Sequence, residues 1–117
     1  MMSAEKLAES VRSALADQGA VREVKMFGGI GFMLNGNLIA GASRRGLLAR
    51  VGAARGKQAL ARPGARPMRM RGRTLEGWIY VDRDALTPRA VDRLMDLALP
   101  YVLSLPRRAR PAKRSAT

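Results

Sequence analysis

The chain has 117 residues, and its 22 lysines and arginines against 9 acidic residues give a formal net charge of +13. It contains no histidine and no cysteine, which excludes disulfides, zinc fingers, iron–sulfur clusters, cysteine nucleophiles and any Ser-His-Asp triad. The length suits one domain that needs no covalent staple to hold a core.

The positive charge is concentrated in two segments. Residues 44–73 carry ten basic residues and no acidic residue, and residues 106–117 carry five basic residues and no acidic residue. Residues 1–43 are neutral overall, and residues 74–105 have a net charge of −2. Basic blocks of this kind attract polyanions. A second interpretation stays open, because 18 arginines against 4 lysines is also what a GC-rich genome produces without selection for binding.

In chain order, the first third predicts an amphipathic helix at residues 3–18 and an edge strand at residues 21–26. It then predicts a hairpin whose two strands are residues 30–34 and 38–40. Ser3 is a suitable N-cap for the helix, and Gly19 is its stop signal. Asn35-Gly36 lies between the two apolar runs of the hairpin. This is the strongest short hairpin signal, because both residues tolerate positive φ.

The remainder predicts a strand at residues 47–51 and a short helix at residues 53–61. An extended segment at residues 65–70 and a strand of alternating pattern at residues 77–81 follow. Thr87-Pro88 then provides an N-cap followed by proline at the first helical position. A long apolar stripe predicts a final helix that Pro100 should kink, or split into residues 88–99 and a short final turn.

Runs of strands with helices at both ends predict an α+β fold. We expect an antiparallel sheet of about five to six strands, with an N-terminal helix, a short middle helix and a C-terminal helix. Residues 1–105 should form a single domain, and residues 106–117 a disordered basic tail without apolar content to bury. The N-terminus lacks the apolar run of a signal peptide, and no stretch is apolar enough to cross a membrane. We therefore expect a cytoplasmic protein without a membrane partner.

The motifs that suggest chemistry are weak. Gly28-Gly29-Ile30-Gly31 resembles a phosphate-binding loop, but it leads into a strand and lacks Gly-Lys-Ser/Thr. We interpret these glycines as sites of a bulge or of close strand packing. Asp82 and Asp84 offer too few oxygen ligands for a hard cation. We therefore predict no catalytic residue, metal site or cofactor, and no enzyme activity.

Two classes of apolar side chain bear on binding. The chain has five aromatic residues, Phe27, Phe32, Trp78, Tyr80 and Tyr101. We expect most of them in the core, which disfavours sequence-specific RNA recognition by base stacking. Five methionines occupy apolar positions, Met26, Met33, Met68, Met70 and Met95. They suit either gap filling in the core or an adaptable partner-binding face.

Two segments carry a family resemblance. MFGGIGFMLNGN at 26–37 and GARPMRMRGRTLEGWIYV at 64–81 resemble the TfoX/Sxy N-terminal domain family, and RVG at 50–52 resembles the end of its next strand. The resemblance implies a compact α+β domain with a central antiparallel sheet and helices at both ends. It assigns structural roles to a set of motif residues: Met26, Phe27, Gly28, Gly29, Gly36, Pro67, Met68, Gly77 and Trp78.

The family is named for regulators of natural competence in bacteria, in which this domain is joined to a second one. Here we expect a stand-alone member, and no catalytic residue carries over. The first functional hypothesis is a non-enzymatic regulatory or interaction module that binds a protein partner, or itself as a homodimer, through a sheet edge or the methionine-rich face.

The alternative hypothesis is an accessory protein that binds nucleic acid independently of sequence. It would use the arginine-rich stretch 44–73 and the tail to contact phosphates. The arginines assigned to this role are Arg66, Arg69, Arg71, Arg73, Arg107, Arg108 and Arg110.

Overall fold

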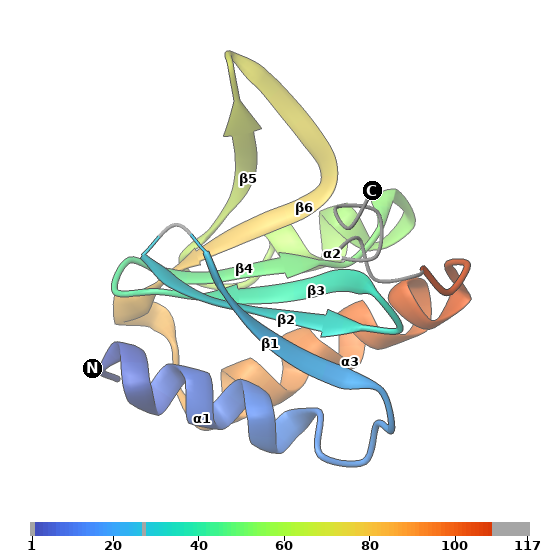
Figure 1. Cartoon of the computed structure of the whole chain (residues 1–117). Coiled ribbons are helices and arrows are strands. Elements are labelled where there is room, and N and C mark those ends of the chain that lie inside the picture. The colour runs from blue at the N-terminus through green and yellow to red at the C-terminus, as the bar shows by residue number, and fades with distance from the viewer. Residues whose placement is uncertain (1, 27, 109–117) are drawn as a thin grey trace.

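The computed structural model describes residues 2–26 and 28–108, and it places six strands in one antiparallel sheet with the order β1-β2-β3-β4-β6-β5 (Figure 1). The strands are β1 (Val21–Met26), β2 (Gly29–Leu34), β3 (Asn37–Ala42), β4 (Gly46–Arg50), β5 (Ala65–Met70) and β6 (Arg73–Asp82). The helices are α1 (Ala4–Ala14), α2 (Gly56–Leu60) and α3 (Pro88–Ser104), with 3₁₀ turns at Ala53–Arg55 and Arg83–Ala85. The predicted α+β class is confirmed.

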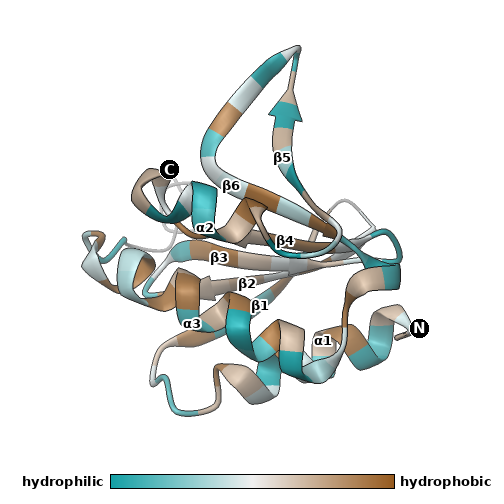
Figure 2. Cartoon of the chain, turned by 180° about the vertical axis from the view of Figure 1, so that it is seen from behind, coloured by the Kyte–Doolittle hydropathy of each residue, from teal (hydrophilic) through white to brown (hydrophobic). Residues whose placement is uncertain are grey.

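The core lies between one face of the sheet and the helices α1 and α3, which pack side by side beneath it (Figure 1). Figure 2 shows apolar residues recurring along both helices. From the helices, Leu7, Val11, Leu94 and Val102 are among the residues that are fully buried. They pack with buried residues of the central strands, such as Phe32, Ile39, Leu47 and Ile79.

The helix α1 is shorter than the periodicity predicts. The Ser3 hydroxyl accepts a hydrogen bond from the Lys6 backbone N–H at 3.1 Å and caps the N-terminus, as predicted. The helix ends at Ala14 rather than at residue 18, because the chain tightens into turns after it. Leu15 is nevertheless buried, so the apolar pattern continues past the last helical residue.

The predicted hairpin is confirmed at Asn35 and Gly36, whose φ angles are +54° and +82°. Positive φ at both central residues is the geometry that a two-residue hairpin needs. The β2–β3 pairing shifts register between Phe32 and Met33, so that Ile39 and Ala40 are both buried although they are consecutive. A bulge therefore brings one extra apolar residue of β3 into the core.

The helix α3 begins as predicted, with the Thr87 hydroxyl accepting a hydrogen bond from the Ala90 N–H at 3.1 Å. The predicted split at Pro100 is wrong, because the helix continues to Ser104. Pro100 is exposed, while Ala98 and Val102 on either side of it are buried against the core. This burial holds the last turn in place despite the missing backbone N–H.

The residues that follow α3 lie against the β2–β3 turn. The Arg108 N–H donates to the Asn35 carbonyl oxygen at 2.9 Å, and the Asn37 side-chain amide donates to the Pro106 carbonyl oxygen at 3.0 Å. The start of the segment predicted to be a tail therefore contacts the domain. The rest of that segment, residues 109–117, lies outside the described residues.

One bidentate ion pair joins α1 to the edge strand β1. The Arg12 Nε lies 2.6 Å from Glu23 Oε2, and the second guanidinium nitrogen lies 2.8 Å from Oε1. The hydrogen bonds from Arg12 lower the pKa of Glu23 below its ordinary value of 4.5. The same pairing raises the pKa of Arg12.

None of the described helices is both long and apolar enough to cross a membrane.

We predict that Gly36→Ala lowers the free energy of unfolding by about 1–3 kcal/mol. Alanine at this position would have to keep a positive φ, and its Cβ would overlap the carbonyl oxygen of Arg108. Urea unfolding measures the change. Gly41→Ala is the matched control, because a Cβ at this position meets its nearest atom, of Leu48, at 3.7 Å. Equal effects of the two substitutions would contradict the prediction.

We predict that Glu23→Gln destabilises the protein most near neutral pH. Because the pKa of Glu23 is lowered in the folded state, the ion pair with Arg12 contributes its full stabilisation above pH 4.5, the ordinary pKa of a glutamate. This stabilisation is lost as the pH falls through the lowered pKa of the folded state. The difference in unfolding free energy between the wild type and this variant should therefore shrink in acid, as measured by denaturant unfolding across pH. Gln58→Ala, an exposed position on α2 without an ionisable group, should show no such trend. A difference that is independent of pH would contradict the assignment.

Candidate functional site

The face of the sheet turned away from α1 and α3 is not covered over β1–β4 by any described helix (Figure 1, Figure 2). One row of cross-strand neighbours on this face spans all six strands: Val24, Gly31, Gly41, Leu48, Tyr80 and Arg66. Because side chains alternate along a strand, this row points away from Phe32 and Ile79, which are buried under the helices. We call this surface the open face.

Apart from Arg22 on β1 and Arg50 at the end of β4, the side chains on the β1–β4 half of the open face are apolar. Its larger side chains are partly buried rather than enclosed: Val24, Met26, Met33, Leu38 and Leu48. The Met26 sulfur and the Leu38 side chain lie over Gly31, where an added Cβ would be 2.7 Å and 3.2 Å from them. Gly41 has more room, because an added Cβ there would meet its nearest atom, of Leu48, at 3.7 Å. An antiparallel sheet commonly presents polar side chains on its solvated face, whereas this half presents mainly apolar ones.

The other half carries an arginine–aromatic cluster, formed by Arg50, Arg66, Trp78, Tyr80 and Tyr101. Arg50 and Trp78 are cross-strand partners on β4 and β6, and the guanidinium carbon lies 4.8 Å from the indole centroid. The Tyr101 ring, at the end of α3, lies 5.6 Å from the same carbon. The Arg66 guanidinium lies 6.0 Å from the Tyr80 ring and is ion-paired with Asp82. Cation–π contacts of this kind hold an arginine in one orientation.

Tyr101 reaches Arg50 because Gly52 lets it approach the backbone. Gly52 has a φ of +85°, and an added Cβ there would overlap the Tyr101 ring. Arg50 differs from Arg66 in having no carboxylate partner among residues 2–26 and 28–108. Its Nε is buried without a hydrogen-bond partner in this part of the chain. Neither Arg50 nor Tyr101 was selected by sequence reasoning as a functional residue.

The expectation that most aromatic residues lie in the core is wrong. Phe32 is fully buried, but Trp78, Tyr80 and Tyr101 are partly exposed in the cluster. Phe27 lies outside the described residues. The methionines divide in the same way: Met95 is buried in the core, Met26, Met33 and Met68 are partly buried, and Met70 is exposed.

The four central arginines assigned to nucleic-acid binding lie on one hairpin, formed by β5 and β6, which stands out from the sheet (Figure 1). Arg66, Arg69, Arg71 and Arg73 are all exposed. Arg71 and Gly72 form the tip, with φ angles of +54° and +77°. We call this hairpin with its four arginines the basic arm. Pairing with β5 starts β6 at Arg73, well before the predicted residue 77.

The tail arginines are not part of this arm. Arg107 and Arg108 are exposed, and the backbone of Arg108 is bonded to the β2–β3 turn. Arg110 lies outside the described residues. The structure therefore groups four of the seven assigned arginines and places two others next to a different hairpin.

The family-motif residues have mainly structural surroundings. Gly29 faces the Ala42 carbonyl so closely that a side chain would overlap it, and Gly77, with a φ of +86°, lies against Gly52 and Ala53. Gly28 and Gly36 adopt positive φ, and Pro67 and Met68 lie at the register shift of the edge strand β5. Of this set, Met26 and Trp78 contribute side chains to the open face.

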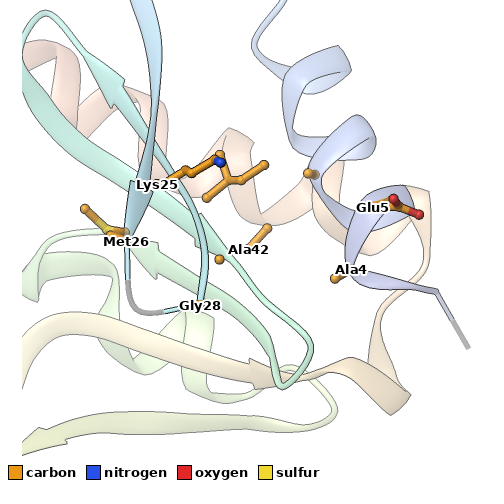
Figure 3. Close-up of a pocket in the computed structure, with 9 residues that line it drawn as sticks. Ala4, Glu5, Lys25, Met26, Gly28 and Ala42 are labelled. Atoms are coloured by element: carbon orange, nitrogen blue, oxygen red, sulfur yellow. The ribbon is translucent and has the colours of Figure 1, made fainter.

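A separate cleft of about 580 Å³ lies between the first turn of α1 and the β1–β2 connection (Figure 3). Its lining is mainly apolar, and Glu5 and Lys25 are its ionisable side chains among the described residues. Figure 3 shows the Glu5 carboxylate turned away from Lys25. No group of three or more acidic residues that could hold a metal ion occurs among the described residues. The cleft therefore offers a small apolar depression and no visible nucleophile–base pair.

Comparison with protein families shows to which family this chain belongs. The sequence profile of the TfoX N-terminal domain matches residues 13–100. The chain belongs to the TfoX N-terminal domain family. Searches of the curated proteins and of the solved structures found no match. The matched region of the TfoX N-terminal domain includes Arg50, the basic arm and Trp78, and it ends one residue before Tyr101.

Proposed function

We propose that this TfoX N-terminal domain is a non-enzymatic regulatory module that binds a protein partner on its open face. The observation that supports this proposal is the group of partly buried apolar side chains on the β1–β4 part of the open face, which no described helix covers. Burial of apolar area contributes roughly 25 cal/mol per Å², so a partner that covers this face gains binding free energy from it. The methionines adapt their shape to a partner more easily than branched side chains do.

The face is better suited to binding than the β5 edge. Pro67 removes one backbone donor from β5, and the strand has a register shift beside it. Prolines, bulges and basic side chains are the devices that protect an edge strand from pairing. The β1 edge lacks a proline and remains a route for self-association.

The wider biological setting is also part of the proposal. The family takes its name from bacterial regulators of competence, which supports a regulatory role in the bacterial cytoplasm. The absence of histidine and cysteine from the sequence, together with the apolar lining of the cleft, supports a role in binding rather than catalysis. The family name alone supports a role in competence regulation itself.

The basic arm supports a second candidate function, sequence-independent binding to nucleic acid. Arg69, Arg71 and Arg73 are exposed and have no carboxylate partner in the described chain. Such a hairpin can contact phosphates without reading bases. It therefore remains an alternative to protein binding, supported by a different part of the molecule.

We predict that a photoreactive residue at position 48 cross-links a protein partner, or a second copy of the chain, more efficiently than one at position 93 on α3. Once the partner is purified, Leu48→Glu should weaken its binding about tenfold or more, because a carboxylate would interrupt the apolar surface. Arg93→Glu, on the helix side, is the matched control. Binding that survives Leu48→Glu unchanged would contradict the proposed surface.

For the alternative, we predict that affinity for duplex DNA falls with salt and that a double Arg71→Ala, Arg73→Ala variant has a shallower dependence. Removing two phosphate contacts should reduce the slope of log K against log salt by about 2. Titrations at several salt concentrations measure it, and Arg89→Ala with Arg93→Ala serves as the charge-matched control. Absence of DNA binding at low salt would exclude this alternative.

A further inference from the structure

We propose that the open face recognises an acidic, apolar segment of a partner protein in extended conformation, with Arg50 as the anchor for a carboxylate. This inference rests on the proposed function and specifies its partner. Three observations support it: the unpaired, oriented guanidinium of Arg50, the apolar surface beside it, and the basic charge around it.

Arg50 is oriented before any ligand arrives. Trp78 and Tyr101 both lie within cation–π distance of its guanidinium. A planar guanidinium held in one orientation binds a carboxylate through two parallel hydrogen bonds, with less entropy to lose than a free side chain. Its buried Nε has no hydrogen-bond partner among the described residues. The site therefore has a fixed cation whose charge is not balanced by a carboxylate in that part of the chain.

Arg66 also lies over an aromatic ring of this face, but unlike Arg50 it has an ion-pair partner. It lies over Tyr80, next to Trp78 on the same face of β6, and its charge is already matched by Asp82. An incoming carboxylate at Arg66 would have to compete with that pair. The comparison assigns the anchoring role to Arg50.

The spacing of residues along β4 determines where the apolar part of the ligand would lie. Leu48 and Arg50 are two residues apart on the same face, which corresponds to about 6.6–6.8 Å. An extended segment has the same repeat for side chains that point to one side. A carboxylate on Arg50 therefore places an apolar side chain of the ligand, two residues away, over Leu48 and its cross-strand neighbour Gly41.

The same contacts disfavour a nucleic acid on this face. Base stacking needs free aromatic rings, whereas Trp78 and Tyr80 each already have a guanidinium over the ring. Beyond the cluster, the surface consists mainly of apolar groups such as Val24, Met33 and Leu38, which offer phosphates no hydrogen bond, with Arg22 on the edge strand β1 as the basic side chain there. The basic arm next to the cluster would attract an acidic segment and speed its encounter.

Trp78 provides the readout, because it is the one tryptophan of the sequence. The probe is a synthetic peptide of Leu-Ser-Glu-Ser repeats, and its control replaces every glutamate by glutamine. We expect the glutamate peptide to change Trp78 emission saturably and the glutamine peptide to bind about tenfold more weakly. Arg50→Met should remove this preference, whereas Arg93→Met on α3 should preserve it.

Arg50→Lys is the second variant, since it keeps the charge but not the paired hydrogen bonds; it should retain part of the preference. Circular dichroism confirms that each variant is folded, and the two peptides test the inference on the unaltered protein as well. Equal binding of both peptides by the wild type would overturn the carboxylate anchor and leave apolar docking at Leu48 intact. Binding of oligothymidylate but of neither peptide, weakened by Arg50→Met, would overturn both proposals.

Discussion

The packing of α1 and α3 against one face of the sheet is the contact on which the rest of the structure depends. Antiparallel strands alternate their side chains between two faces, so covering one face decides the environment of every residue on the other. Phe32, Leu47 and Ile79 are buried because the helices lie over them. Met33, Leu48 and Trp78, one residue along in each strand, are left partly exposed by the same arrangement. The core and the open face are therefore two results of one packing event.

Much of the fold could be predicted because its signals are local. Asn35-Gly36 prescribes a hairpin through its backbone preferences, and Thr87-Pro88 prescribes a helix start through a side-chain cap and a fixed φ. The split of the last helix at Pro100 is wrong for the opposite reason: the burial of Ala98 and Val102, which is tertiary, outweighs the local cost of the proline. The end of α1 was also misplaced, because Leu15 is buried from a turn.

The candidate site was harder to predict, since its parts are distant in sequence. The alternation in β6 showed that Trp78 and Tyr80 share a face, but no local pattern indicates which face the helices cover. Tyr101 meets Arg50 because Gly52 permits a close approach between α3 and the end of β4. Arg50 belongs to the basic stretch, and only the pairing of β4 with β6 separates it from Arg69, Arg71 and Arg73 of the arm. The net charge of +13 thus contains arginines in different states: stacked, ion-paired and free.

The hydrogen bonds that join Pro106 and Arg108 to the β2–β3 hairpin also determine how the domain carries mechanical load. A pull on the backbone at Arg108 acts on these two bonds and on the β2–β3 turn before it can unwind α3. The last described residues therefore lie at the hairpin that joins two strands of the open face, and not at the end of α3.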